Sequence, residues 1–390
     1  MITQLELGGA QQNTLFTVSH LNRLWFRPIL ITGEPGLLDQ EARSLNGIQF
    51  HQIPSLVRHI RPFKDLRALL SLTRLLRRLR PDIVHTHSSK AGVLGRLAAK
   101  FAGVPIIIHT IHGFGFTSYQ RPLRRQEFLV AERIVSRLTT KFFAVSHANR
   151  RMGIHLGLFP EDRCVVIRSG VDLAGLRRTR VDVVVKKREM GCDPNRPMVG
   201  MIAPLKPQKA PLDFVRVAGL VHRVRADVEF VLVGDGELRH AVEVEVNRLK
   251  LKDAFRLLGW RRDTAEILRC LDVFVLTSLW EGLPRVYLEA LASGVPVVGT
   301  RVDGAAEVIC DGVNGFLAEP GDIDDLAQRL LSLLDDPELA RSMGKQGEAL
   351  PSEFDIHHMV RRQEQEYERL MSGLTHGASV NEARELVHRG

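Results

Sequence analysis

Short runs of β-branched and aliphatic residues alternate with longer amphipathic stretches along the whole chain. Strand-length runs that are apolar at nearly every position are typical of parallel strands buried on both faces. The pattern predicts strands at Pro28–Thr32, Asp82–His85, Pro105–Thr110, Lys141–Ser146, Cys164–Ile167, Met198–Ala203, Val228–Val233, Phe255–Leu258, Asp272–Thr277 and Val295–Thr300. The helices predicted between them include Leu66–Leu79, Ala91–Ala102, Pro122–Leu138, Leu212–Val224 and Ile323–Leu334. Such alternation indicates doubly wound α/β sheets, which bind ligands at the carboxyl ends of their strands.

The strands fall into two series, separated by a polar stretch near Leu173–Pro197 that is expected to be irregular. A chain of 390 residues is long enough for two domains. We therefore predict Rossmann-like domains at 1–180 and 190–355, a C-terminal helix over 356–371 that crosses back to the N-terminal domain, and a tail over 372–390. Only Met1–Glu6 precede Leu7, so the first strand is expected to be short.

Composition narrows the class of protein. Hydrophobic residues make up 44% of the chain and charged residues 25%, which excludes a mainly disordered chain. The four cysteines are scattered without a CxxC pair, so we expect reduced thiols and no disulfide framework. No apolar run reaches the ~18 residues of a membrane span, and no signal peptide is visible. We expect a cytoplasmic protein, at most peripheral on the inner face of the membrane.

The positive charge lies in the first half of the chain. Residues 1–190 hold 30 Lys and Arg against 13 Asp and Glu, or +17, and the rest contributes −8 to the net +9. The segment Arg58–Arg80 is a basic amphipathic helix pattern, which indicates either an anionic membrane surface or a packed helix with a solvated arginine face. A nucleic-acid-binding protein is the third interpretation, but no recognition motif or interleaved aromatic residues support it.

The ordinary nucleotide-binding motifs fail. The nearest approach to GxGxxG begins at Gly234 and has Arg239 in place of the third glycine, and no GxxxxGK loop is present. Gly8 and Gly9 precede a predicted helix, where glycines let backbone N–H groups approach an anion. A bare turn explains this pair equally well.

The densest candidate chemistry lies in the block Ser278–Thr300. Glu281 is placed on a loop after a buried strand, and Glu289 lies in the following helix with seven residues between the two. Carboxylates at the edge of a sheet accept hydrogen bonds from sugar hydroxyls. Two solvated surface glutamates are the alternative interpretation.

This block resembles the C-terminal domain of retaining glycosyltransferases of family 4 (glycosyl transferases group 1), which have the GT-B fold of two Rossmann-like domains facing across a cleft. Glu281 and Glu289 match the EX7E motif of that family. The resemblance covers roughly residues 5–370 and includes, in order, Leu7–Gln11, His85–Gly92, His109–Gly113, Val231–Leu238, Leu258–Trp260 and Gly304–Glu307.

The resemblance implies transfer of a sugar from a nucleotide-sugar donor with retention at the anomeric carbon. Glu281, His112 and Lys209 would be the catalytic residues, with Glu281 and His112 near the transferred sugar. Glu289 would hold the ribose. The nucleotide-sugar site so implied comprises Gly8, Gly9, Lys206, Lys209, Gly234, Gly259, Trp260, Glu281, Gly282, Leu283 and Glu289.

The departing nucleoside diphosphate gains negative charge, so positive groups must face it. Lys209 matches the family lysine, but Pro204 stands where the family usually has arginine. Lys206 is the candidate replacement. The family generally needs no metal or other cofactor. His85, His87 and His109 also suggest a metal site, but no carboxylate or cysteine accompanies them at a ligand spacing.

The donor is expected to be a UDP-sugar, by analogy with the family alone. The acceptor would be a glycan or a lipid-linked intermediate in polysaccharide, lipopolysaccharide or other glycoconjugate biosynthesis. The alternative is a nucleotide-sugar 2-epimerase of the same fold, which product analysis without an acceptor would distinguish.

Overall fold

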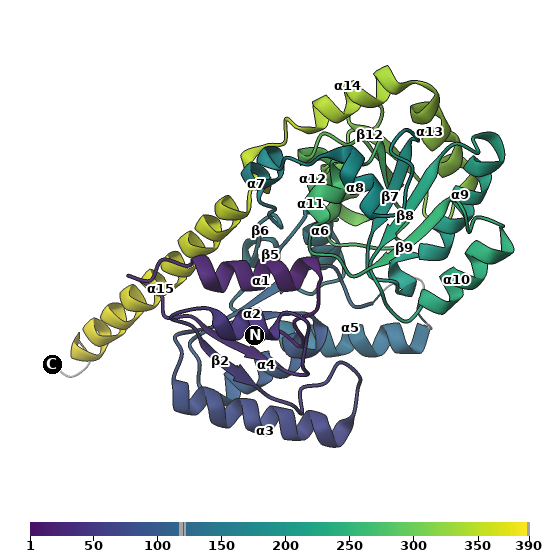
Figure 1. The fold of residues 1–390 in the computed structure, drawn as a ribbon. Coiled ribbons are helices and arrows are strands. Elements are labelled where there is room, and N and C mark those ends of the chain that lie inside the picture. The colour runs from purple at the N-terminus through teal and green to yellow at the C-terminus, as the bar shows by residue number, and fades with distance from the viewer. Residues whose placement is uncertain (117–119, 121, 388–390) are drawn as a thin grey trace. The chain divides into compact units, whose positions relative to one another are not determined.

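The computed structural model describes residues 1–116, 120 and 122–387, with residues 124 and 375–387 described as backbone only. The chain divides into two compact units (Figure 1). Unit 1 comprises Met1–Val145, Asn149–Ser169 and the chain from Ile356 onward. Unit 2 comprises Ser146–Ala148 and Gly170–Asp355.

Unit 1 is built on parallel strands. One sheet has the order β3-β4-β5-β6, and β1 pairs with β2 beside it. The strands are β1 (Ile29–Thr32), β2 (Gln49–Gln52), β3 (Ile83–His87), β4 (Ile106–Ile111), β5 (Lys141–Ala144) and β6 (Cys164–Val166). The helices are α1 (Gly9–His20), α2 (Asp39–Ser44), α3 (Pro62–Leu79), α4 (Ser89–Ala102), α5 (Pro122–Ser136), α6 (His147–His155), the 3-10 turn η1 (Glu161–Arg163) and α15 (Ile356–Val387).

The first residues of the chain connect these two sheets. The Ile2 N–H donates to Ile31 O of β1 (3.0 Å), and the His87 N–H of β3 donates to Met1 O (2.8 Å). The segment has no ladder long enough to count as a strand, as expected from its shortness. It nevertheless takes the place of a strand between β1 and β3.

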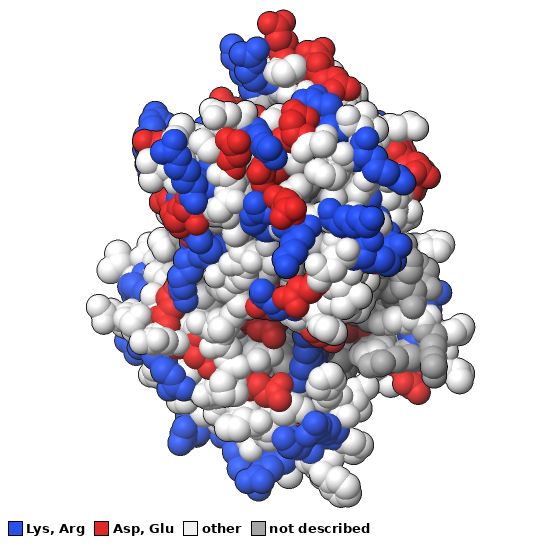
Figure 2. Space-filling view, turned by 45° about the vertical axis from the view of Figure 1, so that its right-hand side comes forward, with Lys and Arg blue, Asp and Glu red and all other residues white. Residues whose placement is uncertain are grey.

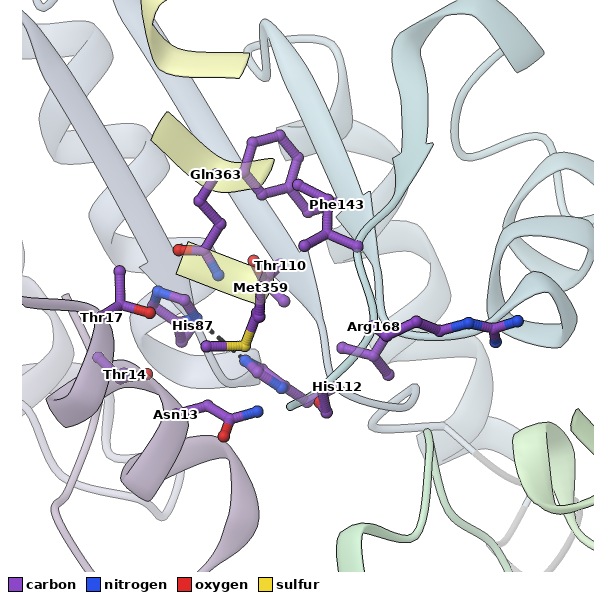
Figure 3. Close-up of a pocket in the computed structure, with 13 residues that line it drawn as sticks. Asn13, Thr14, Thr17, His87, Thr110, His112, Phe143, Arg168, Met359 and Gln363 are labelled. Atoms are coloured by element: carbon purple, nitrogen blue, oxygen red, sulfur yellow. Dashed lines mark hydrogen bonds between the residues drawn. The ribbon is translucent and has the colours of Figure 1, made fainter. Parts of the chain in front are cut away.

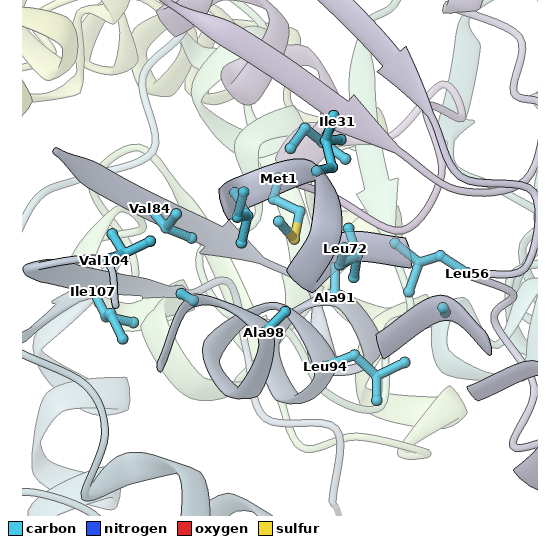
Figure 4. Close-up of a cluster of buried hydrophobic side chains, with 14 residues drawn as sticks. Met1, Ile31, Leu56, Leu72, Val84, Ala91, Leu94, Ala98, Val104 and Ile107 are labelled. Atoms are coloured by element: carbon cyan, nitrogen blue, oxygen red, sulfur yellow. The ribbon is translucent and has the colours of Figure 1, made fainter. Parts of the chain in front are cut away.

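The core beneath this join is formed by α3 and α4 against the strands (Figure 4). Leu72 of α3 and Ala98 of α4 are fully buried, and they meet Ile31, Val84 and Ile107 from three strands. Each fully buried side chain of this size contributes about 1.5–3 kcal/mol relative to exposure. This packing holds α3 by one face and leaves its other face to solvent.

Helix α15 belongs to unit 1. Ile356, Met359 and Tyr367 are buried against Phe143 of β5 and Ile108 of β4. Its backbone stays helical to Val387, so the range 372–387 differs from the tail that the sequence predicted. Good helix formers follow Asn381, but the stretch from Ser372 to Asn381 includes Gly373 and Gly377, so its own propensity does not explain the continuation.

Unit 2 contains one parallel sheet of six strands in the order β12-β11-β10-β7-β8-β9. The strands are β7 (Met198–Ile202), β8 (Glu229–Val233), β9 (Phe255–Gly259), β10 (Val273–Leu276), β11 (Val297–Thr300) and β12 (Gly315–Ala318). The helices are α7 (Leu173–Arg178), α8 (Val183–Glu189), α9 (Pro211–Val224), α10 (Arg239–Arg248), α11 (Thr264–Leu268), α12 (Arg285–Ala292), α13 (Ile323–Asp335) and α14 (Pro337–Gly347). The 3-10 turns are η2 (Pro207–Lys209), η3 (Asp303–Glu307) and η4 (Ser352–Phe354).

The stretch expected to be irregular differs from the prediction. It contains α7 and α8, each begun by an aspartate, Asp172 or Asp182, whose side chain accepts a backbone N–H of the first turn. Unit 2 begins at Gly170, earlier than the boundary near 180, because α7 packs on α12 within that unit. Among the described residues, no helix combines the length and apolar character needed to cross a bilayer.

Candidate active site

The site in unit 2 lies where the order of its strands reverses. The chain runs outward from β7 through β8 to β9 and then returns to β10, which pairs with the other side of β7. The carboxyl ends of β7 and β10 are therefore neighbours, and such a switch point is where open α/β sheets bind ligands. Lys209 follows β7 and Glu281 follows β10.

These two residues form an ion pair. Lys209 Nζ contacts Glu281 Oε1, and the two side chains are only 14% and 9% exposed. The Ser278 hydroxyl donates to the same carboxylate oxygen (2.7 Å). A largely desolvated, hydrogen-bonded pair interacts more strongly than a surface pair, so it holds both side chains in one place.

The loops that carry the pair are bound to each other. The Leu279 N–H donates to Gln208 O and the Gln208 side chain donates to Trp280 O, both at 2.8 Å. The Thr277 hydroxyl donates to Lys209 O (3.1 Å). These hydrogen bonds between the two loops therefore fix the positions from which Lys209 and Glu281 reach each other.

Asp303 supports Glu281 from a third loop. Its Oδ2 accepts the Glu281 N–H at 2.7 Å, and its φ of +35° lies in the left-handed region that non-glycine residues rarely adopt. Burial is the main cause that raises the pKa of Asp303 to about 6, while the backbone hydrogen bond from Glu281 opposes the shift and the charge of Glu281 adds to it. Strain of this kind at a site persists because surrounding contacts hold it.

Glu289 lies on α12 and pairs with Arg285 one turn earlier, at 3.3 Å. The Arg285 Nε–H also donates to Gly170 O (3.1 Å). Burial lowers the pKa of Arg285, and the neighbouring Glu289 opposes that shift. Glu289 is 20% exposed. It is thus an oriented carboxylate in contact with solvent, as a ribose-binding group must be.

The glycine-rich loop after β8 lies against the loop after β7. Gly234 has a φ of +129°, and a Cβ there would lie 2.0 Å from Ala203 O. The Gly234 N–H donates to Gly259 O (2.8 Å). Trp260 follows with 40% of its surface exposed. Only glycine permits this approach of two loops at the carboxyl ends of β7 and β8.

The remaining predicted residues of unit 2 lie on the same loops. Gly282 O accepts the Gly304 N–H (3.2 Å), and Leu283 is 6% exposed. Lys206 is half-buried at the start of η2, three residues before Lys209. Its role in place of the family arginine stays a prediction.

The predicted residues of unit 1 are Gly8, Gly9 and His112. Gly8 caps α1, with its carbonyl accepting the Gln12 N–H (3.0 Å). His112 follows β4, is half-buried, and shares a hydrogen bond of 3.0 Å between its Nε2 and Nδ1 of His87 in a small pocket (Figure 3). The structure thus brings the predicted residues together in two groups, one in each unit.

The histidines of unit 1 are engaged with neighbours of their own. His85 bonds Tyr367 and Thr110, both at 2.6 Å, and His109 bonds the Thr86 hydroxyl at 2.9 Å. Within the described part of the chain, no three His, Cys, Asp or Glu side chains are grouped so that they could hold a metal ion.

Sequence reasoning missed Ser278, Asp303 and Arg285. Ser278 and Arg285 lie inside the block that drew attention to Glu281, but a serine or an arginine there carries no signal by itself. Asp303 was hidden because its role depends on a left-handed backbone conformation. The only hint is its place next to Gly304.

This parallel α/β fold with charged loops at a switch point is that of the GT-B transferases. Residues 7–174 match the model of glycosyltransferase family 4, and residues 185–350 match that of the glycosyl transferases group 1. Both matches together cover most of the chain. The protein belongs to this family and is a glycosyltransferase.

Two curated relatives show how far the similarity extends. A galactosyltransferase of Escherichia coli named UDP-Gal:alpha-D-GlcNAc-diphosphoundecaprenol alpha-1,3-galactosyltransferase is 35% identical over 85% of this chain and 86% of its own. An N,N'-diacetylbacillosaminyl-diphospho-undecaprenol alpha-1,3-N-acetylgalactosaminyltransferase of Campylobacter jejuni is 26% identical over 81% and 84%.

Solved structures confirm the fold. Anabaena HepE in complex with UDP-glucose has a TM-score of 0.77 at 22% identity and covers 95% of this chain and 100% of its own. WaaG, a glycosyltransferase involved in lipopolysaccharide biosynthesis, has a TM-score of 0.74 at 15% identity, with 93% and 98% covered. These matching families and relatives are transferases, so the epimerase alternative gains no support from them.

Proposed function

We propose that this enzyme transfers a sugar from a UDP-sugar to a lipid-linked diphosphate acceptor, with retention at the anomeric carbon. The observation that carries the proposal is the buried Lys209–Glu281 pair at the switch point of unit 2. The names of the two curated relatives supply the substrate class, since both act on diphospho-undecaprenol acceptors. HepE complexes with UDP and UDP-glucose support the choice of nucleotide.

In this mechanism Lys209 faces the diphosphate. As the glycosidic bond breaks, negative charge accumulates on the leaving phosphate, and a fixed ammonium group stabilises it more than it stabilises the intact donor. Glu281 keeps the ammonium group in place and accepts hydrogen bonds from hydroxyls of the transferred sugar. Ser278 and Asp303 hold Glu281 by its side chain and its backbone.

The nucleotide is held by the other loops of unit 2. Glu289 accepts hydrogen bonds from the ribose hydroxyls, and the loop at Gly259 and Trp260 lies beside the base. Positive groups and backbone N–H groups supply the charge stabilisation, so we propose that catalysis needs no metal ion or other cofactor. The leaving phosphate takes the proton of the attacking acceptor hydroxyl, which balances the transfer.

The donor is tested first by binding. A panel of UDP-, GDP- and ADP-sugars is compared by thermal stabilisation of the protein, where a ligand at 100 times its Kd stabilises by about 2.7 kcal/mol. We expect stabilisation by UDP-sugars and its loss in Lys209→Ala. Stabilisation by none of the donors would exclude the proposal.

The acceptor is tested by turnover. The enzyme is given the stabilising donor and a synthetic polyprenyl-diphospho-GlcNAc, and the anomeric configuration of the product is read by NMR. We expect an α-linked product from an α-linked donor. An inverted product would contradict the proposed stereochemistry, and transfer only to water would contradict the proposed acceptor. Neither outcome would contradict the proposed donor.

We also propose that α3 rests on the anionic surface of the cytoplasmic membrane, where such an acceptor lies. Its buried face packs in the core, yet Phe63, Leu66 and Leu70 are 92%, 57% and 47% exposed. Basic side chains flank this stripe, and most charged side chains visible at the lower end of the molecule in Figure 2, where α3 lies in Figure 1, are blue. Exposed apolar side chains among cations match an anionic lipid surface.

Co-sedimentation with vesicles tests this contact. We expect binding to vesicles with anionic lipid, release by salt, and loss of binding in a Phe63→Ser, Leu66→Ser variant. Val224→Ser removes a 67% exposed apolar residue of unit 2 and serves as the control. Equal binding of the variant, or equal binding to neutral vesicles, would refute the role of α3.

A further inference from the structure

The hydrogen bond between His87 and His112 is unusual because both partners are imidazoles. His87 is 7% exposed on β3, and its ring centroid lies 4.3 Å from that of His85 and 5.3 Å from that of His112. Burial, followed by the charges of neighbouring histidines, lowers the pKa of His87 well below its ordinary value. His87 is therefore a neutral ring at physiological pH.

A bond between Nδ1 of one ring and Nε2 of the other contains a single hydrogen. If His87 donates, Nε2 of His112 is the acceptor and the hydrogen of neutral His112 lies on Nδ1. If His112 donates, its hydrogen lies on Nε2, and Nδ1 of the neutral ring carries no hydrogen. In either case the bond ties the ring plane of His112 to the position of the His87 Nδ1.

The ring of His87 is buried beside a second ring that is fully engaged. The neighbouring His85 ring is bonded through both nitrogens, to Tyr367 of α15 and Thr110 of β4, each at 2.6 Å. Asn13 of α1 is 3% exposed and lines the same pocket, with no partner for its Oδ1 among the described residues (Figure 3). Residues of α1, β4, β5 and α15 line this pocket together with His87, and this packing limits the freedom of its ring.

We propose that His87 is a positioning residue, which fixes the orientation of the His112 ring through the bond between their ring nitrogens. This inference rests on the place of His112 near the transferred sugar, which the family resemblance implies and which belongs to the proposed function. Positioning of this kind acts on the reacting centre, while the nucleotide is held by the loops of unit 2. Its loss should lower kcat and leave donor affinity nearly unchanged.

Three substitutions of His87 separate the effect of a correctly placed polar atom from the effect of side-chain volume. In His87→Asn the side-chain amide occupies the place of Nδ1, and by rotating it can donate or accept. In His87→Gln the polar atoms lie one bond further out, and His87→Leu has none. We expect kcat to fall by about 10- to 100-fold in the Leu and Gln variants, and to return within about 3-fold of wild type in the Asn variant.

Nitrogen-15 NMR of histidine-labelled protein reads the tautomer directly. We expect the His112 nitrogen signals of His87→Asn to match those of the wild type, because the amide can make the same bond to Nε2, and those of His87→Leu to shift because the bond is lost. His109→Asn is the matched control, because His109 is 6% exposed and bonds Thr86 rather than His112. It should leave the His112 signals in place, and circular dichroism checks that each variant is folded.

A double substitution completes the test. If His87 acts through His112, the pair His87→Leu, His112→Ala should be no slower than His112→Ala alone. Additive losses, or a His87→Asn variant as slow as His87→Leu, would overturn the inference. A His112→Ala enzyme with wild-type turnover would instead remove the proposed role of His112 itself.

Discussion

Replacement of Asp303 should change how the free energy of unfolding depends on pH, by an amount that follows from the burial of this carboxyl group. Its carboxylate accepts the Glu281 N–H at 2.7 Å, and burial raises its pKa to about 6 from an ordinary value of 3.8. Asp303→Asn keeps an acceptor oxygen in the same place and removes the charge. The substitution therefore tests the cost of the ionised carboxylate with little change in shape.

The sign follows from proton linkage. Because the pKa of Asp303 is higher in the folded than in the unfolded chain, the carboxyl stabilises the fold below pH 3.8 and loses that contribution as the pH rises to about 6. The full difference is about 3 kcal/mol, of which about 2 falls between pH 4.5 and 7.5. Solvent screening at this half-buried position reduces the expected change to about 1–2 kcal/mol.

The measurement is urea unfolding at several pH values, followed by tryptophan fluorescence, since Trp280 immediately precedes Glu281. The free energy of unfolding of Asp303→Asn, relative to wild type, should rise by that amount from pH 4.5 to 7.5. Exposed Asp253 supplies the control, because Asp253→Asn should keep the pH dependence of the wild type. A difference that stays flat within about 0.5 kcal/mol would show that burial does not raise the pKa of Asp303.

Further predictions concern packing, thiols and metal. Gly299→Ala places a Cβ 1.9 Å from the hydroxyl and 2.6 Å from the ring carbon Cζ of the fully buried Tyr287, so it should lower the free energy of unfolding by about 1–3 kcal/mol, and an unchanged free energy in urea unfolding would contradict this close packing. Cys310 is exposed, so one thiol should react quickly with a disulfide reagent under native conditions, and a second fast thiol would contradict the assigned burial. Burial raises the pKa of each of the other three thiols, which are Cys164, Cys192 and Cys270. Removal of divalent cations with a chelator should leave turnover unchanged, and loss that only added metal restores would refute catalysis without metal.

The strands that the sequence predicted are all present, and two more were missed. Nearly continuous apolar runs such as Val228–Val233 identify central strands because both faces are buried. The missed strands are β2, whose sequence Gln49–Gln52 is mostly polar, and β12, a run of four residues at the edge of its sheet. β2 is defined by its pairing with β1 and not by its own hydrophobicity, whereas β12 is apolar but short.

The site was predictable where its residues follow a motif. Glu281 was expected from its position after a strand and Lys209 from its match to the family lysine, and the strand order that makes them neighbours appears only in the folded sheet. The contributions of Ser278 and Asp303 depend on distances between loops. No spacing along the chain encodes those distances.

The place of α15 in unit 1 has a consequence for synthesis on the ribosome. Phe143 and Ile108 are covered by Met359 and Tyr367, which leave the exit tunnel more than two hundred residues later. Unit 2 is nearly one continuous stretch of sequence and has all its parts sooner. One face of the sheet in unit 1 thus stays exposed until α15 has been synthesised. A chaperone would have to shield this face until translation ends.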